Sequence, residues 1–99
     1  MNKKSKREIL YYKSYYLDFF IKLKPEVKKK FNWTLQLIET IDRVPEKYFQ
    51  HLTGTTGLYE VRVEVGPNIY RVFCFFDKGQ LIILVNGFQK KEDSESAYK

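Results

Sequence analysis

The stretch LYEVRVEVGPNIYRVFCFF, residues 58–76, decides the fold of this chain. Its first part, Leu58–Val65, alternates between apolar and charged residues. The apolar side carries Tyr59, Val61, Val63 and Val65. A period of two is typical of a half-buried β-strand, because successive side chains of a strand point to opposite faces of the sheet. Gly66-Pro67-Asn68 then predicts a turn, so residues 69–76 are expected to return as a second, antiparallel strand.

Further strands extend this hairpin on both sides. Asp77-Lys78-Gly79 predicts a second turn and residues 81–88 a third strand, which completes an antiparallel meander. Residues 7–12 predict a short early strand. Residues 44–57 have an irregular pattern and are interpreted as a connection. Three apolar residues are expected to hold this connection to the core: Tyr48, Phe49 and Leu52.

Two helices are predicted between the early strand and the meander. Ser14 is a suitable N-cap for the first, because its hydroxyl can accept a hydrogen bond from a free backbone N–H. The apolar face of this helix has the spacing i, i+3, i+4, i+7: Tyr16, Phe19, Phe20 and Leu23. Lys24-Pro25 ends this helix and starts the second, because proline disfavours helical geometry in the residue before it but suits a first helical turn.

The second helix is expected to cover residues 25–42. Its main apolar stripe is Val27, Phe31, Leu35, Ile38 and Ile41, widened by Trp33 and Leu37. The lysine block at 28–30 is interpreted as part of the solvated face rather than as an RNA contact, because charge runs are usually solvated. The order of elements predicts an α+β fold in a single domain, residues 1–99. An N-terminal helical hairpin is expected to pack on a small, twisted, mainly antiparallel sheet.

The charge of the chain favours an anionic partner. Lys and Arg total 18 against 12 Asp and Glu, which gives a formal net charge of +6 and favours polyanions or acidic partners. A membrane is not expected as a partner, because the apolar stretch 9–23 is interrupted by Lys13, Asp18 and Lys22 and is too short to span a bilayer. The stretch also lacks the features of a signal peptide, so we expect a cytoplasmic protein.

Residues for metal or covalent chemistry are scarce. Cys74 is the single cysteine, which excludes an internal disulfide and a multi-cysteine metal site, and its apolar neighbours predict a buried, unreactive thiol. His51 is the single histidine, so Ser–His or Cys–His catalysis would depend on it alone. The sequence has no glycine-rich phosphate loop. We expect neither a metal nor another cofactor.

Two arginines in the strands of the hairpin require an explanation. A two- or four-residue loop places Arg62 directly opposite Arg71, whereas a three-residue loop places them on opposite faces. The first register is preferred, because it also gathers the apolar residues on the face that the helices cover and leaves Phe73 and Phe75 beside the arginines. Two facing arginines repel each other unless an anion lies near. That anion is either Glu60 or Glu64 in a surface ion pair, or a bound phosphate, which the planar guanidinium holds with two hydrogen bonds.

Three segments in order carry a resemblance to a known family: LYEVRV at 58–63, IYRVF at 69–73 and GFQKK at 87–91. They resemble the RelE/ParE superfamily of bacterial toxins, in particular its phage-derived, HigB-like branch. In that branch a strand of the type leucine/tryptophan/tyrosine-glutamate-leucine-arginine, a tyrosine-arginine strand and a glycine-phenylalanine-x-lysine-lysine ending recur in this order. No single segment is specific, but the three occur in the family's order. The resemblance covers most of the chain, including the helical hairpin and the approach to the sheet at Leu52-Thr53-Gly54.

The resemblance implies a RelE-like fold and a toxin of a type II toxin–antitoxin system. The toxin would be a ribosome-dependent mRNA endoribonuclease, neutralised by a cognate helix-turn-helix antitoxin of the HigA or Xre type. Its partners would be the ribosome and mRNA. Such enzymes cleave RNA through attack of a ribose 2′-hydroxyl on the adjacent phosphate, without a metal. This chemistry needs a base, an acid and cations that stabilise the charge on the phosphate.

Carried over by position, the resemblance gives roles to the basic residues. Arg62 and Arg71 would clamp the phosphate. Lys90 and Lys91 would position the RNA or add charge at the reacting group, and Phe73 is a candidate RNA contact beside the arginines. This sequence departs from the family pattern at Glu60, because RNA-cleaving relatives can have a basic residue at that position.

The acid and base are open. Tyr98 is one candidate, because some members of the superfamily have a tyrosine after the basic pair; the alternative is an exposed residue of a polar tail. His51 is the other candidate, and its alternative is a loop histidine that packs on the sheet.

Two other functions also stay open. One is a non-catalytic inhibitor of DNA gyrase, like ParE, which the lack of an unambiguous base favours. The other is a plain RNA-binding module, although Phe73 and Phe75 do not form the spread-out stacking surface typical of single-strand readers.

Overall fold

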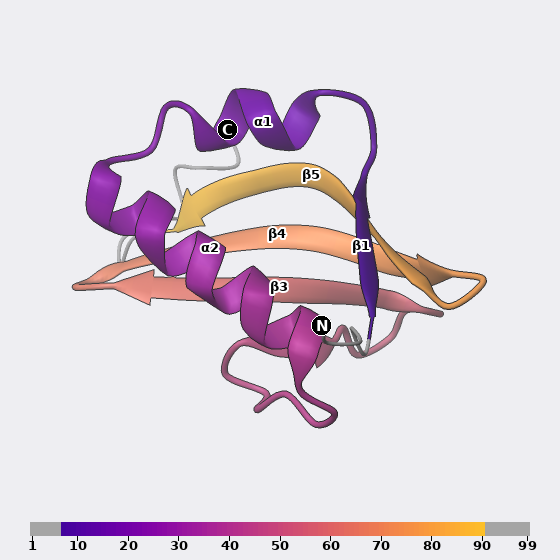
Figure 1. Ribbon diagram of the computed structural model, residues 1–99. Coiled ribbons are helices and arrows are strands. Elements are labelled where there is room, and N and C mark those ends of the chain that lie inside the picture. The colour runs from indigo at the N-terminus through magenta and orange to yellow at the C-terminus, as the bar shows by residue number, and fades with distance from the viewer. Residues whose placement is uncertain (1–6, 91–99) are drawn as a thin grey trace, which may run out of the picture.

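The computed structural model describes the backbone of residues 7–90 and the side chains of residues 7–83. The elements, in chain order, are β1 (Glu8–Tyr11), α1 (Tyr15–Phe20), α2 (Pro25–Thr40), β2 (Phe49–His51), β3 (Leu58–Val65), β4 (Asn68–Asp77) and β5 (Gln80–Lys90). The strands form one sheet in the order β1-β5-β4-β3-β2, in which β1 runs parallel to β5 and all other pairs are antiparallel. Both helices lie over one face of this sheet, with α1 against β5 and α2 against β3 (Figure 1). The predicted α+β fold, a helical hairpin on a mainly antiparallel sheet, is confirmed.

The β3–β4 hairpin has the predicted short loop and the preferred register. Val65 pairs with Asn68, so Gly66 and Pro67 form a two-residue turn. Gly66 has a φ of 60°, which suits the first position of such a turn because glycine has no Cβ to clash there. Arg62 pairs directly with Arg71. The turn between β4 and β5 is also where the sequence predicts it.

The face of the sheet under the helices forms the core. Val61, Val63, Tyr70, Val72 and Cys74 of the hairpin are buried there, as predicted. They pack with Leu81 and Ile83 of β5 and with the stripe of α2. Phe76 is an exception, because it was expected to be buried on this face. It meets the rings of Phe49 and Tyr59 edge-on, but it remains 38% exposed. Burial, aided by the nearby Glu60, raises the pKa of Cys74 to about 12, so this thiol is buried and protonated as expected.

Helix α2 departs from its prediction in two details. Trp33 was expected to widen the apolar stripe, but it is 46% exposed. Thr34 is buried in its place, since its hydroxyl donates a hydrogen bond to the carbonyl of Lys30 at 2.7 Å and needs no water. The helix also ends at Thr40, before the predicted Asp42.

The end of α2 is held by a residue that the sequence pattern did not single out. The guanidinium of Arg7, just before β1, donates hydrogen bonds to the carbonyls of Ile38, Ile41 and Asp42 at 2.7, 2.8 and 2.6 Å. Free carbonyls and the negative end of the helix dipole both favour a cation at this position. Arg7 therefore joins the early strand to the helix.

The start of α1 also differs from its prediction. Ser14 stands at the N-cap position, but no side-chain capping hydrogen bond forms. Its hydroxyl instead donates a hydrogen bond to the carboxylate of Asp18 at 3.2 Å. The helix is short, and its exposed side carries several large apolar residues together with the end of β1: Leu10, Tyr11, Tyr12, Tyr15, Leu17 and Ile21.

The predicted connection at 44–57 contains a strand. Residues Phe49–His51 form β2, which pairs with Tyr59–Val61 of β3. Three residues are too few to show alternation, which is why the sequence pattern did not reveal the strand. Phe49 belongs to the core and Tyr48 packs against it, so the predicted contact is confirmed for these two residues. Leu52 is half-buried. Among the described residues, no helix is long and apolar enough to cross a bilayer.

Candidate functional site

The arginine pair lies on the face of the sheet that the helices leave open. Arg62 and Arg71 face each other across β3 and β4, and about a quarter of each side chain is exposed. Each arginine has its own acidic neighbour. A guanidinium nitrogen of Arg62 lies 3.2 Å from a carboxylate oxygen of Glu64, and a guanidinium nitrogen of Arg71 lies 3.8 Å from a carboxylate oxygen of Glu60.

The two acidic neighbours differ in their environment. Glu64 is 56% exposed, so its pair with Arg62 is the surface ion pair that the sequence suggested, worth about 0–1 kcal/mol. Glu60 is only 1% exposed and was expected at the surface. It pairs with Gln50 of β2 on one side and with Phe73 of β4 on the other, so neighbouring strands enclose it. The undetected β2 is the physical reason for this difference.

The polar groups of the site are incompletely bonded. Within the part of the chain that the structure describes, both carboxylate oxygens of Glu60 and the Nε atoms of Arg62 and Arg71 are buried without a hydrogen-bond partner. Buried polar groups are rarely left unpaired, because each costs about 1–3 kcal/mol. A cluster of unpaired donors and a carboxylate on one open face is therefore a functional-site candidate rather than a feature that stabilises the fold.

The structure brings together only some of the predicted site residues. Phe73 lies on β4 opposite Glu60 and is half-buried beside the arginines. His51 is exposed on β2, where it pairs with Tyr59 and meets its ring edge-on at 5.2 Å. Because Tyr59 belongs to the helix-covered side of β3, His51 lies across the sheet from Arg62 and Arg71.

The remaining predicted site residues lie near or beyond the end of the described chain. The backbone of Lys90 pairs with Ile69, two residues before Arg71. Lys91 and Tyr98 lie outside the described residues.

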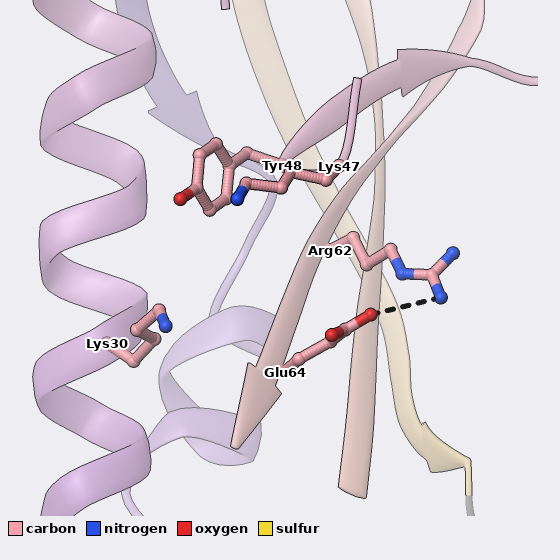
Figure 2. A pocket seen from close by; sticks show the side chains of 5 residues that line it. All are labelled: Lys30, Lys47, Tyr48, Arg62 and Glu64. Carbon is pink, nitrogen blue, oxygen red and sulfur yellow. Dashed lines mark ion pairs between the residues drawn. The ribbon is translucent and has the colours of Figure 1, made fainter. Parts of the chain in front are cut away.

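A small pocket adjoins the arginine pair at the edge of β3 (Figure 2). It has a volume of about 130 Å³ and is lined by Lys30, Lys47, Tyr48, Arg62 and Glu64. Lys30 was expected on the solvated face of α2, and Lys47 had no predicted role. Their proximity arises from the packing of α2 on β3, which periodicity alone does not specify.

The fold and the open face define a small α+β protein with two arginines and two glutamates side by side on its sheet. Residues 18–99 match the family described as Phage derived protein Gp49-like (DUF891). The match spans most of the chain, and the chain belongs to this phage-derived family. Comparisons with curated proteins and with solved structures gave no match.

Proposed function

We propose that this protein is the toxin of a type II toxin–antitoxin system and cleaves mRNA on the ribosome. The observation that carries the proposal is the cross-strand pair of Arg62 and Arg71, backed by the buried and unbonded carboxylate of Glu60. Membership of the Gp49-like family and the resemblance to HigB-like toxins agree with this function. The finer assignment to the HigB-like branch of the RelE/ParE superfamily is part of the proposal.

The arginine pair suits the metal-free cleavage of RNA. In that reaction the 2′-oxygen bonds to the adjacent phosphorus, the bond from phosphorus to the 5′-oxygen breaks, and a proton passes from the 2′-hydroxyl to a base while an acid protonates the 5′-oxygen. Negative charge builds on the phosphate oxygens in the transition state. Two guanidinium groups on neighbouring strands can bind these oxygens, and Glu60 at 3.8 Å favours the position of Arg71.

The candidates for the acid and the base remain Tyr98 and His51 in the proposal, while Lys91 adds charge at the phosphate. The position of His51 on the opposite side of the sheet from the arginines favours Tyr98. It is also the observation that favours a second candidate function. A ParE-like inhibitor of DNA gyrase would use the same cationic face for binding and would need no base.

The proposed partner is an antitoxin with a helix-turn-helix domain, of the HigA or Xre type. We expect it to cover or distort the face that carries Arg62 and Arg71. The exposed apolar side chains of β1 and α1 give a protein partner a further contact surface, since apolar patches on a small protein often mark such interfaces. Co-purification of the two proteins tests this; failure to associate would contradict it.

The function can be tested by controlled expression in a bacterial host. Growth, protein synthesis and mRNA 5′ ends would be compared for wild type, Arg71→Ala and the matched control Arg43→Ala, which removes an exposed arginine from the loop after α2. We expect growth arrest with new cuts inside translated messages for wild type and Arg43→Ala only. Arrest with intact messages and altered plasmid supercoiling would favour the gyrase inhibitor instead.

A further inference from the structure

The pocket beside Arg62 lies where the sheet has an open edge. Strand β2 pairs with β3 only as far as Val61, and one further hydrogen bond joins the N–H of Arg62 to the carbonyl of Tyr48 at 2.9 Å. The last three residues of β3 extend beyond this point. In Figure 2, Lys30 projects from α2 toward this edge while Arg62 extends away from the helix, so the pocket connects the helix side of the edge with the open face.

Aromatic rings and lysines alternate around the pocket. Trp33 is 46% exposed and meets the ring of Tyr48 edge-on, with ring centres 5.3 Å apart. The ammonium nitrogen of Lys30 lies 6.0 Å from the centre of the Trp33 ring, and that of Lys47 lies 5.1 Å from the centre of the Tyr48 ring. Trp33 is not part of the buried core, and nearly half of its surface is open to a ligand. Cations beside exposed aromatic faces are typical of proteins that bind single-stranded nucleic acid.

The charges of the pocket favour an anion. Three cations, Lys30, Lys47 and Arg62, stand against one carboxylate, so their sum is +2. Within the described residues, the ion pairs of this region are those of Arg62 with Glu64 and of Arg71 with Glu60, and neither lysine takes part in them. Glu64 is largely exposed and can turn into solvent, so an incoming phosphate can take its place beside Arg62.

We propose that this pocket binds the phosphate of a nucleotide in single-stranded RNA, next to the phosphate held by Arg62 and Arg71, with a neighbouring base stacked on Trp33. The inference rests on the proposed function and extends its site around the edge of β3. Arg62 is shared by the two positions, as expected for consecutive phosphates of one strand. The strand must be single, because only an unstacked base can lie on an aromatic side chain.

The test uses the full chain and a fluorescent hexanucleotide of 2′-O-methyl RNA, which cannot be cleaved by 2′-hydroxyl attack. Its affinity would be measured by anisotropy at several salt concentrations. The variants Lys30→Gln and Lys47→Gln are compared with Lys29→Gln, which removes an exposed lysine of the same helix that does not line the pocket. All variants are checked for unchanged thermal unfolding.

We expect Lys30→Gln and Lys47→Gln each to weaken binding by roughly three- to tenfold and to lower the salt slope by about 0.7, the value for one phosphate contact on a single strand. Lys29→Gln should remain within about twofold of wild type. Trp33→Ala should weaken binding by roughly tenfold through lost stacking. Glu64→Gln should strengthen binding, because it removes the carboxylate that competes for Arg62.

Equal losses in Lys30→Gln and Lys29→Gln would overturn the inference, since the lysines would then act only through overall charge. Tighter binding of an acidic glutamate-rich peptide than of the hexanucleotide, lost in Lys30→Gln, would also overturn it and identify a protein segment as the occupant. The pocket and the nuclease function can fail separately. If the protein cuts messages but the pocket variants bind the hexanucleotide like wild type, only the proposed pocket is rejected. If the variants show the predicted binding pattern but no messages are cut, only the nuclease function is rejected.

Discussion

The two faces of the sheet differ in the kind of side chain that they bury. On the face under the helices, Val61, Val72 and Cys74 are fully buried among apolar neighbours. On the open face, Glu60 is buried just as completely, but its carboxylate has no hydrogen-bond partner among the described residues, and the two arginines beside it are incompletely bonded. The first face stabilises the fold through apolar burial, whereas the second leaves two arginine N–H groups unbonded, and a bound anion could accept hydrogen bonds from them. Substitutions on the two faces should therefore separate stability from activity.

The largest expected effect is on the helix-covered face. Phe31→Ala removes a fully buried ring that contacts Tyr16, Phe19 and Tyr70, and should lower the free energy of unfolding by about 3–5 kcal/mol. Phe75→Ala is the matched change on the open face, where the ring is only half-buried, and should cost less than half as much. Urea unfolding measures both; equal losses would remove the proposed contrast between the faces.

A smaller effect is expected from the pair Glu60 and Arg71. Arg71→Ala leaves the buried carboxylate without its neighbouring cation and should lower the free energy of unfolding by roughly 1–3 kcal/mol. Adding Glu60→Gln removes the buried charge, so the double variant should regain most of that stability without regaining RNA cleavage. A double variant no more stable than Arg71→Ala would show that Glu60 is not held as a buried charge.

The buried thiol of Cys74, on the helix-covered face, should make the free energy of unfolding depend on pH. Its pKa in the folded protein, about 12, lies above the ordinary value of 9.0, so the unfolded chain releases this proton first as the pH rises. The unfolded state then binds fewer protons, and the free energy of unfolding should fall by about 1 kcal/mol between pH 9 and pH 10. In this window Cys74→Ala should show a flatter profile; an unchanged slope would contradict burial of the thiol.

The smallest effect is expected at the exposed ion pair. Glu64→Gln removes the partner of Arg62, yet it should change the free energy of unfolding by less than about 0.5 kcal/mol, because the pair is exposed to solvent. Thermal unfolding at low and high salt measures this. A loss above about 1 kcal/mol would mean that Glu64 stabilises the open face and would weaken the contrast between the two faces.

Regular periodicity made much of this fold predictable. The strict alternation of β3, the short Gly66-Pro67 turn and the proline at the start of α2 led to the correct elements, and the sorting of apolar residues led to the correct facing of Arg62 and Arg71. Short elements were less visible. The three residues of β2 carry no detectable period, and without β2 the burial of Glu60 could not be foreseen.

Contacts between distant segments account for the other differences. Arg7 reaches the end of α2, more than thirty residues away, and no local pattern specifies such a contact. The pocket likewise depends on where α2 packs, because it joins Lys30 to Lys47 and Arg62. Side chains that meet only through tertiary packing are visible in the structure and not in the sequence.

The central claim is that the open face cleaves RNA through the arginine pair, and it can be tested with purified ribosomes and a defined message. Cuts would be mapped by primer extension for wild type, Arg71→Lys and the double variant Glu60→Gln/Arg71→Ala, each at matched folded fraction. Lysine keeps the charge but lacks the planar fork, so we predict roughly tenfold slower cutting for Arg71→Lys and at least about a hundredfold for the double variant. Cutting at the wild-type rate by the folded double variant would contradict the account.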